Sequence, residues 1–259
     1  MTTVASWNVN SLKVRLPQLG EWLGANPVDV IGLQETKLTD ENFPQADIEA
    51  LGYHVLRSGQ KTYNGVALLS RQPIEDAKLA LDGLDDPQRR VAIGTSGGVR
   101  YVNLYVPNGQ AVGSEKYEYK LRWLDALYCT LEAELAAHPR VVVMGDFNIA
   151  PDDRDVYDPL AWAGQILCSD AERAALTRLL GLGLHDSFRL FEQPPASFSW
   201  WDYRQAGFRR NLGLRIDLIL ASDALRAACR TSTVDREPRR AERPSDHAPV
   251  VAHFDLAGL

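Results

Sequence analysis

The sequence predicts an α/β protein in which two β-sheets are sandwiched between helices. Short apolar runs rich in β-branched residues recur along the whole chain, and segments with helical periodicity lie between them. The chain has 259 residues, which is enough for one large core, and no linker rich in Pro, Gly or Ser divides it. We therefore expect a single domain over residues 1–259.

Eight apolar runs are expected to form buried strands, because each is short and most are rich in Val, Ile or Leu. In chain order they cover residues 3–7, 28–33, 66–69, 91–93, 99–106, 141–144, 216–221 and 249–254. Such runs have the length of strands and are too short for most helices. They are numerous enough to form two sheets.

Three segments have the spacing of amphipathic helices. The first places Leu12, Leu16, Leu19 and Leu23 on one face, the second does the same with Leu121, Leu124, Tyr128, Leu131 and Leu135, and the third covers residues 170–180. The second helix is expected to begin after Ser114, whose hydroxyl can accept a hydrogen bond from a free backbone N–H.

Composition excludes several classes of protein. No run approaches the ~18 apolar residues that a membrane span needs, and the first residues lack the basic and apolar regions of a secretory signal. Cys129, Cys168 and Cys229 are odd in number, far apart and free of Cys-x-x-Cys spacing, so they indicate neither a disulfide framework nor a thiolate zinc site. We expect a cytoplasmic protein that does not bind membranes.

The charge is distributed unevenly along the chain. The formal net charge of −6 argues mildly against a nucleic-acid partner. However, residues 200–243 contain ten arginines and six acidic residues, so this stretch carries +4 and the rest of the chain −10. The sequence therefore predicts a basic stripe on an acidic body.

Polar and acidic residues recur at the ends of the predicted strands. They are Asn8, Gln34, Glu35, Asp146, Asn148, Asp217, Asp246 and His247. If these strand ends meet at one edge of the sheets, several carboxylates share a pocket, and their burial without a cation would be costly. Oxygen ligands without a thiolate favour a hard ion, so the pattern predicts Mg²⁺, with Mn²⁺ as a substitute.

Each of these residues also has an ordinary structural interpretation. Glu35 can cap or pair at a surface loop, Asp146 and Asn148 can be turn residues, and His247 can be a loop histidine. Asp217 is harder to explain in this way, because aliphatic residues flank it on both sides. The hypothesis of a shared site depends on the repetition of the pattern.

Six segments of the chain resemble, in order, the motifs of bacterial exonuclease III and the related apurinic/apyrimidinic endonucleases. They are residues 7–10 (WNVN), 33–37 (LQETK), 105–109 (YVPNG), 145–150 (GDFNIA), 213–217 (GLRID) and 245–249 (SDHAP). The resemblance covers nearly the whole chain. It implies the four-layer α/β sandwich of the endonuclease, exonuclease and phosphatase superfamily, with two packed mixed β-sheets flanked by helices.

The resemblance also implies roles for the polar residues around the metal. Glu35 is similar to the family's principal metal carboxylate, and Asn8 and Asp246 are similar to residues close to the same ion. Asp146 resembles the acid that activates the attacking water, and Asn148 the amide that orients this water or the phosphate.

Three more residues resemble groups that contact the phosphate in this family, and a fourth resembles the partner of one of them. His247 is similar to a histidine at the scissile phosphate, and Asp217 to the carboxylate that partners it. Tyr105 matches a tyrosine beside the phosphate and the leaving oxygen, and Asn108 a phosphate-binding amide. The resemblance leaves open whether Asp146 or His247 takes the proton.

Aromatic residues alternate with arginines over residues 198–215, which suits contacts to phosphates and to an unstacked nucleotide. A core aromatic cluster beside a solvated basic loop would have the same composition. By resemblance, Trp200, Leu214 and Ile216 line a pocket for an abasic or 3′-terminal sugar. Arg209 and Arg210 are expected to contact phosphates.

The resemblance implies that the loop over residues 165–170 borders this pocket. Leu167 is then either a plug packed under the loop or a side chain that obstructs an internal abasic nucleotide more than a frayed 3′ end. The second possibility would favour 3′-end processing, including removal of a 3′-phosphate.

Together these features predict a monomeric, Mg²⁺-dependent DNA repair nuclease acting on double-stranded DNA at abasic sites and 3′ ends. The implied reactions are those of an AP endonuclease, a 3′–5′ exonuclease and a 3′-phosphatase. One alternative is a 3′-end-processing enzyme with weak or no AP endonuclease activity. More remote alternatives are a phosphodiesterase or phosphatase acting on a lipid or inositol phosphate, and a binding module with an inactive site.

Overall fold

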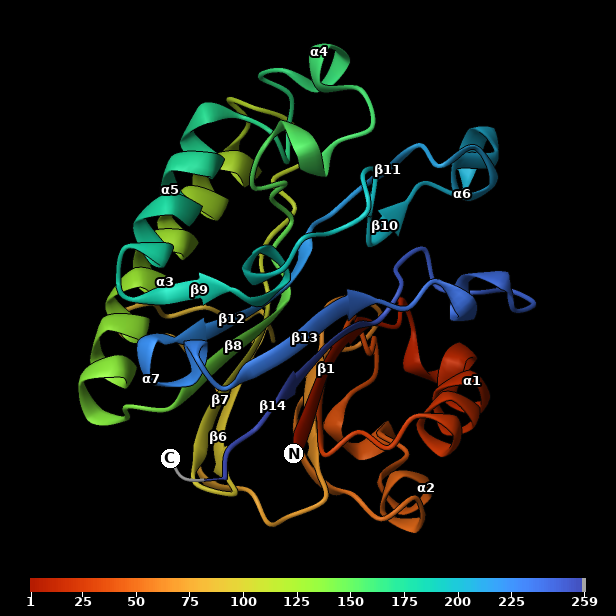
Figure 1. The fold of residues 1–259 in the computed structure, drawn as a ribbon, viewed down its shortest axis with the longest axis vertical. Helices are drawn as coiled ribbons and strands as arrows, with labels where there is room; N and C mark the ends of the chain where they lie inside the picture. The colour runs from red at the N-terminus through yellow and green to blue at the C-terminus, as the bar shows by residue number, and fades with distance from the viewer. Residues whose placement is uncertain (258–259) are drawn as a thin grey trace.

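The computed structural model describes residues 1–257 and contains two six-stranded mixed sheets with helices on both outer sides (Figure 1). The first sheet has the order β13 (Cys229–Val234), β14 (Val250–Phe254), β1 (Thr2–Asn8), β2 (Val30–Gln34), β4 (Val66–Ser70) and β3 (His54–Ser58). The second has the order β5 (Glu75–Lys78), β6 (Val91–Ser96), β7 (Val99–Tyr105), β8 (Val141–Asp146), β12 (Asp217–Ser222) and β9 (Leu184–Asp186).

Three apolar clusters lie between the four layers. Val4 and Leu68 of the first sheet pack with Met144 of the second, so the sheets meet face to face. A second cluster packs the first sheet against α1 (Leu12–Ala25) and α2 (Gln45–Ala50), and a third packs the second sheet against α3 (Glu115–Ala137) and α5 (Asp170–Leu180). This arrangement confirms the predicted four-layer α/β sandwich.

The three predicted helices are present. Ser114 is the N-cap of α3, and its Oγ accepts a hydrogen bond of 3.2 Å from the backbone N–H of Tyr117, as expected. The buried face of α3 differs in part from the predicted one. Leu124 and Leu131 are buried, whereas the other predicted members of this face are only half-buried, because Trp123 and Leu127 also face the sheet.

All eight predicted strands form, with ends that differ by a few residues. Four strands of the two sheets did not show in the sequence pattern, namely β13, β3, β5 and β9. These are the four edge strands. Only one side of an edge strand meets a neighbour, so most of their residues remain partly exposed and no continuous apolar run is required.

Several short elements gather at one end of the sandwich. They include the two-stranded sheet of β10 (Trp200–Trp201) and β11 (Gly213–Leu214) with the short helices α4 (Pro159–Trp162) and α6 (Gly207–Arg210), while α7 (Asp223–Arg226) lies at the opposite end (Figure 1). Among the described residues, no helix has both the length and the apolar character for a membrane crossing.

The topology brings the polar strand ends to this same end of the molecule. The parallel pairs β1–β2 and β7–β8 run toward it, whereas β12 is antiparallel to β8 and begins there. In the register, Asp146 lies between Tyr105 on one side and Asp217 on the other. The predicted convergence of these residues is therefore a result of strand order and register.

Candidate active site

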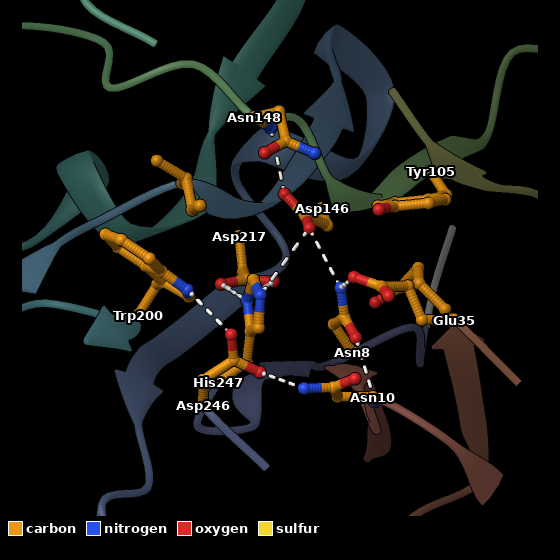
Figure 2. Close-up of polar contacts among 12 residues, drawn as sticks. Asn8, Asn10, Glu35, Tyr105, Asp146, Asn148, Trp200, Asp217, Asp246 and His247 are labelled. Carbon is orange, nitrogen blue, oxygen red and sulfur yellow. Dashed lines mark hydrogen bonds and ion pairs between the residues drawn. The ribbon is translucent and has the colours of Figure 1, made fainter. Parts of the chain in front are cut away.

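The centre of the site is a histidine held between two aspartates (Figure 2). His247 Nδ1 lies 2.9 and 3.1 Å from the two carboxylate oxygens of Asp217, and its Nε2 lies 3.7 Å from Oδ2 of Asp146. Ser199 Oγ donates to Asp217 Oδ2 at 2.6 Å. All of these side chains are buried. The imidazole is therefore fixed in orientation, with Nε2 toward Asp146.

Asp146 is bound from two further directions. Its Oδ2 accepts a 2.9 Å hydrogen bond from Nδ2 of Asn8, and its Oδ1 accepts one of 2.9 Å from the backbone N–H of Asn148. Burial, the largest effect, and the nearby carboxylate of Asp217 raise the pKa of Asp146 to about 7, although His247 acts in the opposite direction. A carboxyl group with this pKa can exchange a proton near neutral pH.

The charge state of His247 follows from the same carboxylates. Burial alone would lower the pKa of this imidazole, but the negative charges of Asp217 and Asp146 outweigh the burial and raise the pKa to about 10. His247 is thus an imidazolium at neutral pH, donating from Nδ1 to Asp217.

Glu35 lies beside this centre and is only partly buried. Its Oε1 accepts a 2.9 Å hydrogen bond from Nδ2 of Asn8, and its Oε2 lies 3.0 Å from Nζ of Lys37. Ligand atoms of Glu35, Asp146 and His247 all lie within 4.8 Å of one another. The carboxylates of Glu35 and Asp146 supply oxygen donors of the kind that a hard divalent cation requires, whereas Asn8 turns its Nδ2 toward them and its Oδ1 accepts from the backbone N–H of Asn10. The residues present therefore fit a metal ion.

Asp246 is held apart from that cluster. Its Oδ1 accepts a hydrogen bond of 2.9 Å from Nδ2 of Asn10, and its Oδ2 accepts one of 3.0 Å from Nε1 of Trp200 (Figure 2). The structure thus groups Glu35 with Asp146 rather than with Asp246. Asn10 belongs to one of the recognised motifs, but nothing in the sequence pattern indicated that it would bind Asp246.

Several residues that shape the site have left-handed backbone conformations. The φ angle is 50° at both Glu35 and Asn148, 43° at Asn10 and 57° at Lys37. Positive φ is uncommon outside glycine, especially for a side chain as long as that of Glu35 or Lys37. Such strain clusters at functional sites, where the surrounding structure enforces it. Of these four residues, Glu35 and Asn148 line the cleft of the site.

Tyr105 and Asn108 reach the site from the end of β7. Burial and the nearby carboxylates of Glu35 and Asp146 raise the pKa of Tyr105 well above its ordinary value, so the phenol remains protonated and can donate a hydrogen bond. Asn108 is exposed, and its Nδ2 donates to Oδ1 of Asn148 at 3.2 Å. Both groups therefore present donors at the edge of the site.

Glu35, Asp146, His247 and other residues of the site line a cleft of about 540 Å³, one wall of which is apolar. Leu167, Ile216 and Trp200 line this wall, whereas Leu214 is fully buried behind it and packs in the same cluster. Leu167 has a φ of 71° and is only 4% exposed. Leu167 is therefore both packed in this cluster and part of the cleft surface.

The predicted basic stripe is only partly a surface feature. Arg215 is buried and forms ion pairs with Asp155 and Asp186 at 2.6 and 2.7 Å. Arg239 is also buried, and it stacks on an aromatic cluster that includes Trp201. The prediction was wrong for these arginines, since long side chains next to aromatic rings and acids can be structural.

Arg209 and Arg210, in contrast, are exposed on α6. Neither residue lines the cleft, but α6 lies at the same end of the molecule as β10 (Figure 1), and Trp200 of β10 is one of the residues that line the cleft. Their guanidinium groups are thus accessible to a ligand that extends beyond the cleft.

Comparison with known proteins places this chain in a defined family. The endonuclease/exonuclease/phosphatase family matches residues 5–247, so the chain belongs to this family and is a hydrolytic nuclease, as predicted. It is 39% identical to exodeoxyribonuclease III of Haemophilus influenzae, over 96% of this chain and 98% of that protein.

Two solved structures extend the comparison. The 3′ phosphatase NExo from Neisseria, bound to a product DNA hairpin, has a TM-score of 0.97 and 49% identity, covering 99% of this chain and 100% of that chain. An AP endonuclease from Archaeoglobus fulgidus has a TM-score of 0.95 and 38% identity, with the same coverage. The chain is therefore similar to enzymes named for two different repair reactions.

Proposed function

We propose that this protein is a DNA repair nuclease that hydrolyses phosphate esters at abasic sites and at the 3′ ends of duplex DNA with the help of Mg²⁺. The observation that carries the proposal is the placement of Asp146. This carboxylate lines the cleft, with Nε2 of the His247 imidazolium 3.7 Å away and the carboxylate of Glu35 beside it. Mg²⁺-dependent incision of abasic duplexes and removal of 3′-terminal groups are the expected reactions.

The protonation states assign the roles of the two titrating groups. Asp146 can act as the base that takes a proton from the attacking water, because its pKa of about 7 leaves a substantial fraction ionised near neutral pH. His247, which is already protonated, supplies positive charge and an N–H donor at Nε2 to the phosphate oxygens. Asp217 keeps the imidazole in this orientation.

Glu35 would hold the metal together with the amide oxygen of Asn8, which would have to turn toward the ion. Asp246, now bonded to Asn10 and Trp200, would likewise have to turn to reach it. A bound Mg²⁺ supplies positive charge against the phosphate oxygens and the leaving oxygen. Tyr105 donates from its phenol toward the phosphate, and Asn148 orients the water or the phosphate with its amide. These donors favour the transition state, because negative charge grows on the oxygens that they face.

Replacement of Glu35 with glutamine is expected to raise the Mg²⁺ concentration for half-maximal activity by about tenfold or more, since one charged ligand is removed. Lys37, its ion-pair partner, keeps a hydrogen bond to Oδ1 of Asn10. The measurement is a Mg²⁺ titration of nuclease rate, with Glu118→Gln on the exposed side of α3 as the control. An unchanged titration would refute the assignment of Glu35.

The double variant Arg209→Ala/Arg210→Ala tests the proposed binding of DNA phosphates by α6. For each arginine that binds a phosphate, its removal should lower the slope of log affinity against log salt by roughly one unit. The control is Arg226→Ala/Arg230→Ala, which removes two exposed arginines, the first of them on α7 at the opposite end. If the α6 variant keeps the wild-type slope while still folding, these arginines are only a solvated surface.

One observation favours a second candidate function, namely 3′-end processing with weak or no AP endonuclease activity. Leu167 lines the cleft next to Ile216. An internal abasic nucleotide must bring its flanking strand past this wall, whereas a 3′ terminus can enter end-on. We infer that 3′-phosphate removal is at least as strong as abasic incision.

Leu167→Gly is expected to raise the ratio of abasic incision to 3′-phosphatase activity by about tenfold. This is the discrimination between two substrates that a small apolar difference in a pocket typically produces. Glycine also adopts the positive φ at this position without strain. Val156→Ala is the matched control, because Val156 packs in the same cluster but does not line the cleft. Equal activity ratios in the two variants would mean that Leu167 is only a core residue.

Three further expectations remain predictions from the sequence. They are a monomeric state, a cytoplasmic location and a single domain over the whole chain. Nothing in the described site favours a lipid or inositol phosphate over a nucleic acid.

A further inference from the structure

A buried lysine lies directly behind the site. Lys120, on the first half of α3, is 0% exposed. Its Nζ donates to the backbone carbonyls of Asn148 at 2.7 Å and Asn108 at 3.2 Å, and it forms an ion pair with Oε1 of Glu172. An ammonium group has three N–H donors, and Lys120 has three acceptors around it. The group is therefore fully bonded.

Two of these acceptors belong to residues that face the phosphate in the proposed mechanism. Asn148 also donates from its backbone N–H to Asp146 and from Nδ2 to the carbonyl of Val106, and its Oδ1 accepts from Asn108. With the bond from Lys120, every polar group of Asn148 has a partner. Because Asn148 has a φ of 50°, its backbone needs such support to remain in place.

The third acceptor connects Lys120 to the loop of the apolar cleft wall. Glu172 Oε1 accepts from the backbone N–H of Leu167 at 3.1 Å, and Oε2 accepts from the N–H and the Oγ of Ser169 at 3.1 and 2.6 Å. Ser169 and Glu172 form the capping box of α5. One ion pair thus joins the phosphate-facing turns to the backbone of Leu167.

Stability alone is a weak explanation for this arrangement. The free energy needed to remove two opposite charges from water is about as large as the free energy that their attraction contributes. Well-packed apolar residues at the same positions often give a protein of equal stability. Moreover, α3 carries a second buried ion pair, in which Glu134 binds Arg100 Nε at 2.7 Å. Neither residue of that pair lines the cleft, so the pair is a purely structural ion pair on the same helix with which Lys120–Glu172 can be compared.

We propose that Lys120 and Glu172 are positioning residues, which fix Asn108 and Asn148 for the chemical step and couple them to the Leu167 loop. The inference depends on the proposed nuclease function, because it assigns an indirect role in that reaction. Loss of the ion pair should therefore lower kcat rather than raise KM, and it should change the preference between 3′-phosphate removal and abasic incision.

The test compares Lys120→Met with the double variant Lys120→Met/Glu172→Gln. The single change leaves the Glu172 carboxylate buried without its cation, so the urea midpoint should fall clearly. The double change removes both charges and should recover part of that loss, because glutamine can still accept at one of the two positions where Glu172 binds a backbone N–H, but the carbonyls of Asn108 and Asn148 still lack their donor. We expect kcat for 3′-phosphate removal to remain about 10- to 100-fold below wild type, with KM within about twofold.

The matched control is Arg100→Met/Glu134→Gln, which should shift the urea midpoint without changing kcat. Recovery of wild-type kcat together with stability in the Lys120 double variant would overturn the proposal. If that variant does not fold, Glu172→Gln decides the question, since an unchanged ratio of the two activities would also overturn it. An inactive wild-type protein would instead contradict the proposed function.

Discussion

Replacement of Asp146 with asparagine is expected to reduce turnover by two or more orders of magnitude, on the order of what removal of a general base costs. An amide cannot take a proton from water. It also cannot accept at both of the positions where Asp146 now accepts, from Nδ2 of Asn8 and from the N–H of Asn148. Binding of DNA and metal should persist, because Glu35, Tyr105 and the cleft wall remain.

The measurement is single-turnover hydrolysis with saturating enzyme, together with a binding assay on the same duplex. Asp125→Asn serves as the control, since this aspartate is 70% exposed and lies outside the cleft. Turnover within about threefold of wild type would exclude Asp146 as the base. A parallel loss of DNA binding would mean that the carboxylate acts mainly in assembly of the site.

Asp155→Ala is expected to have the largest effect on stability, with a loss of about 3–5 kcal/mol in the free energy of unfolding. Asp155 is fully buried, and its Oδ1 and Oδ2 accept from Nε and Nη2 of Arg215 at 2.6 and 3.2 Å. Its Oδ1 also accepts from Arg189. Removing the carboxylate would leave the buried guanidinium of Arg215 with Asp186 as its remaining ion-pair partner.

Urea unfolding is the direct measurement of this loss. Asp125→Ala, which removes an exposed ion pair with Arg178, should change stability by no more than about 1 kcal/mol. Arg215 lies between Leu214 and Ile216, so the Asp155 variant should also disturb the apolar cleft wall. A loss of stability no larger than that of the surface control would contradict the structural role of this ion pair.

The central strands of the fold could be predicted from the sequence because they are buried on both faces, which requires continuous apolar runs such as Val141–Met144. The edge strands could not be predicted from the sequence in this way. β5, for instance, has the sequence Glu-Asp-Ala-Lys and is mostly exposed, so its strand conformation comes from pairing with β6 and not from its own composition.

The residues of the site that could be predicted from the sequence are those that lie at strand ends or in motifs. His247 and Asp217 are far apart in the sequence, and their contact results from the register of β12 and the bridge between Trp200 and His247. Ser199 and Lys120 could not be assigned, because a serine or lysine inside a helix or loop gives no pattern that indicates its partner. Arg215, in contrast, was assigned a wrong role: its charge suggested a place in the basic surface stripe, whereas its side chain is buried.

Metal-dependent cleavage of damaged DNA is the activity on which the proposed mechanism depends most directly. The decisive measurement gives the purified protein three labelled duplexes, carrying an internal abasic site, a recessed 3′ end and a 3′-phosphate, each with Mg²⁺ and with a chelator. We predict hydrolysis with Mg²⁺, loss of activity with the chelator, and 3′-phosphate removal at least as fast as abasic incision. No hydrolysis of any duplex in the presence of Mg²⁺ would contradict the proposed function, and turnover of sphingomyelin or an inositol phosphate instead would assign the site to another substrate class.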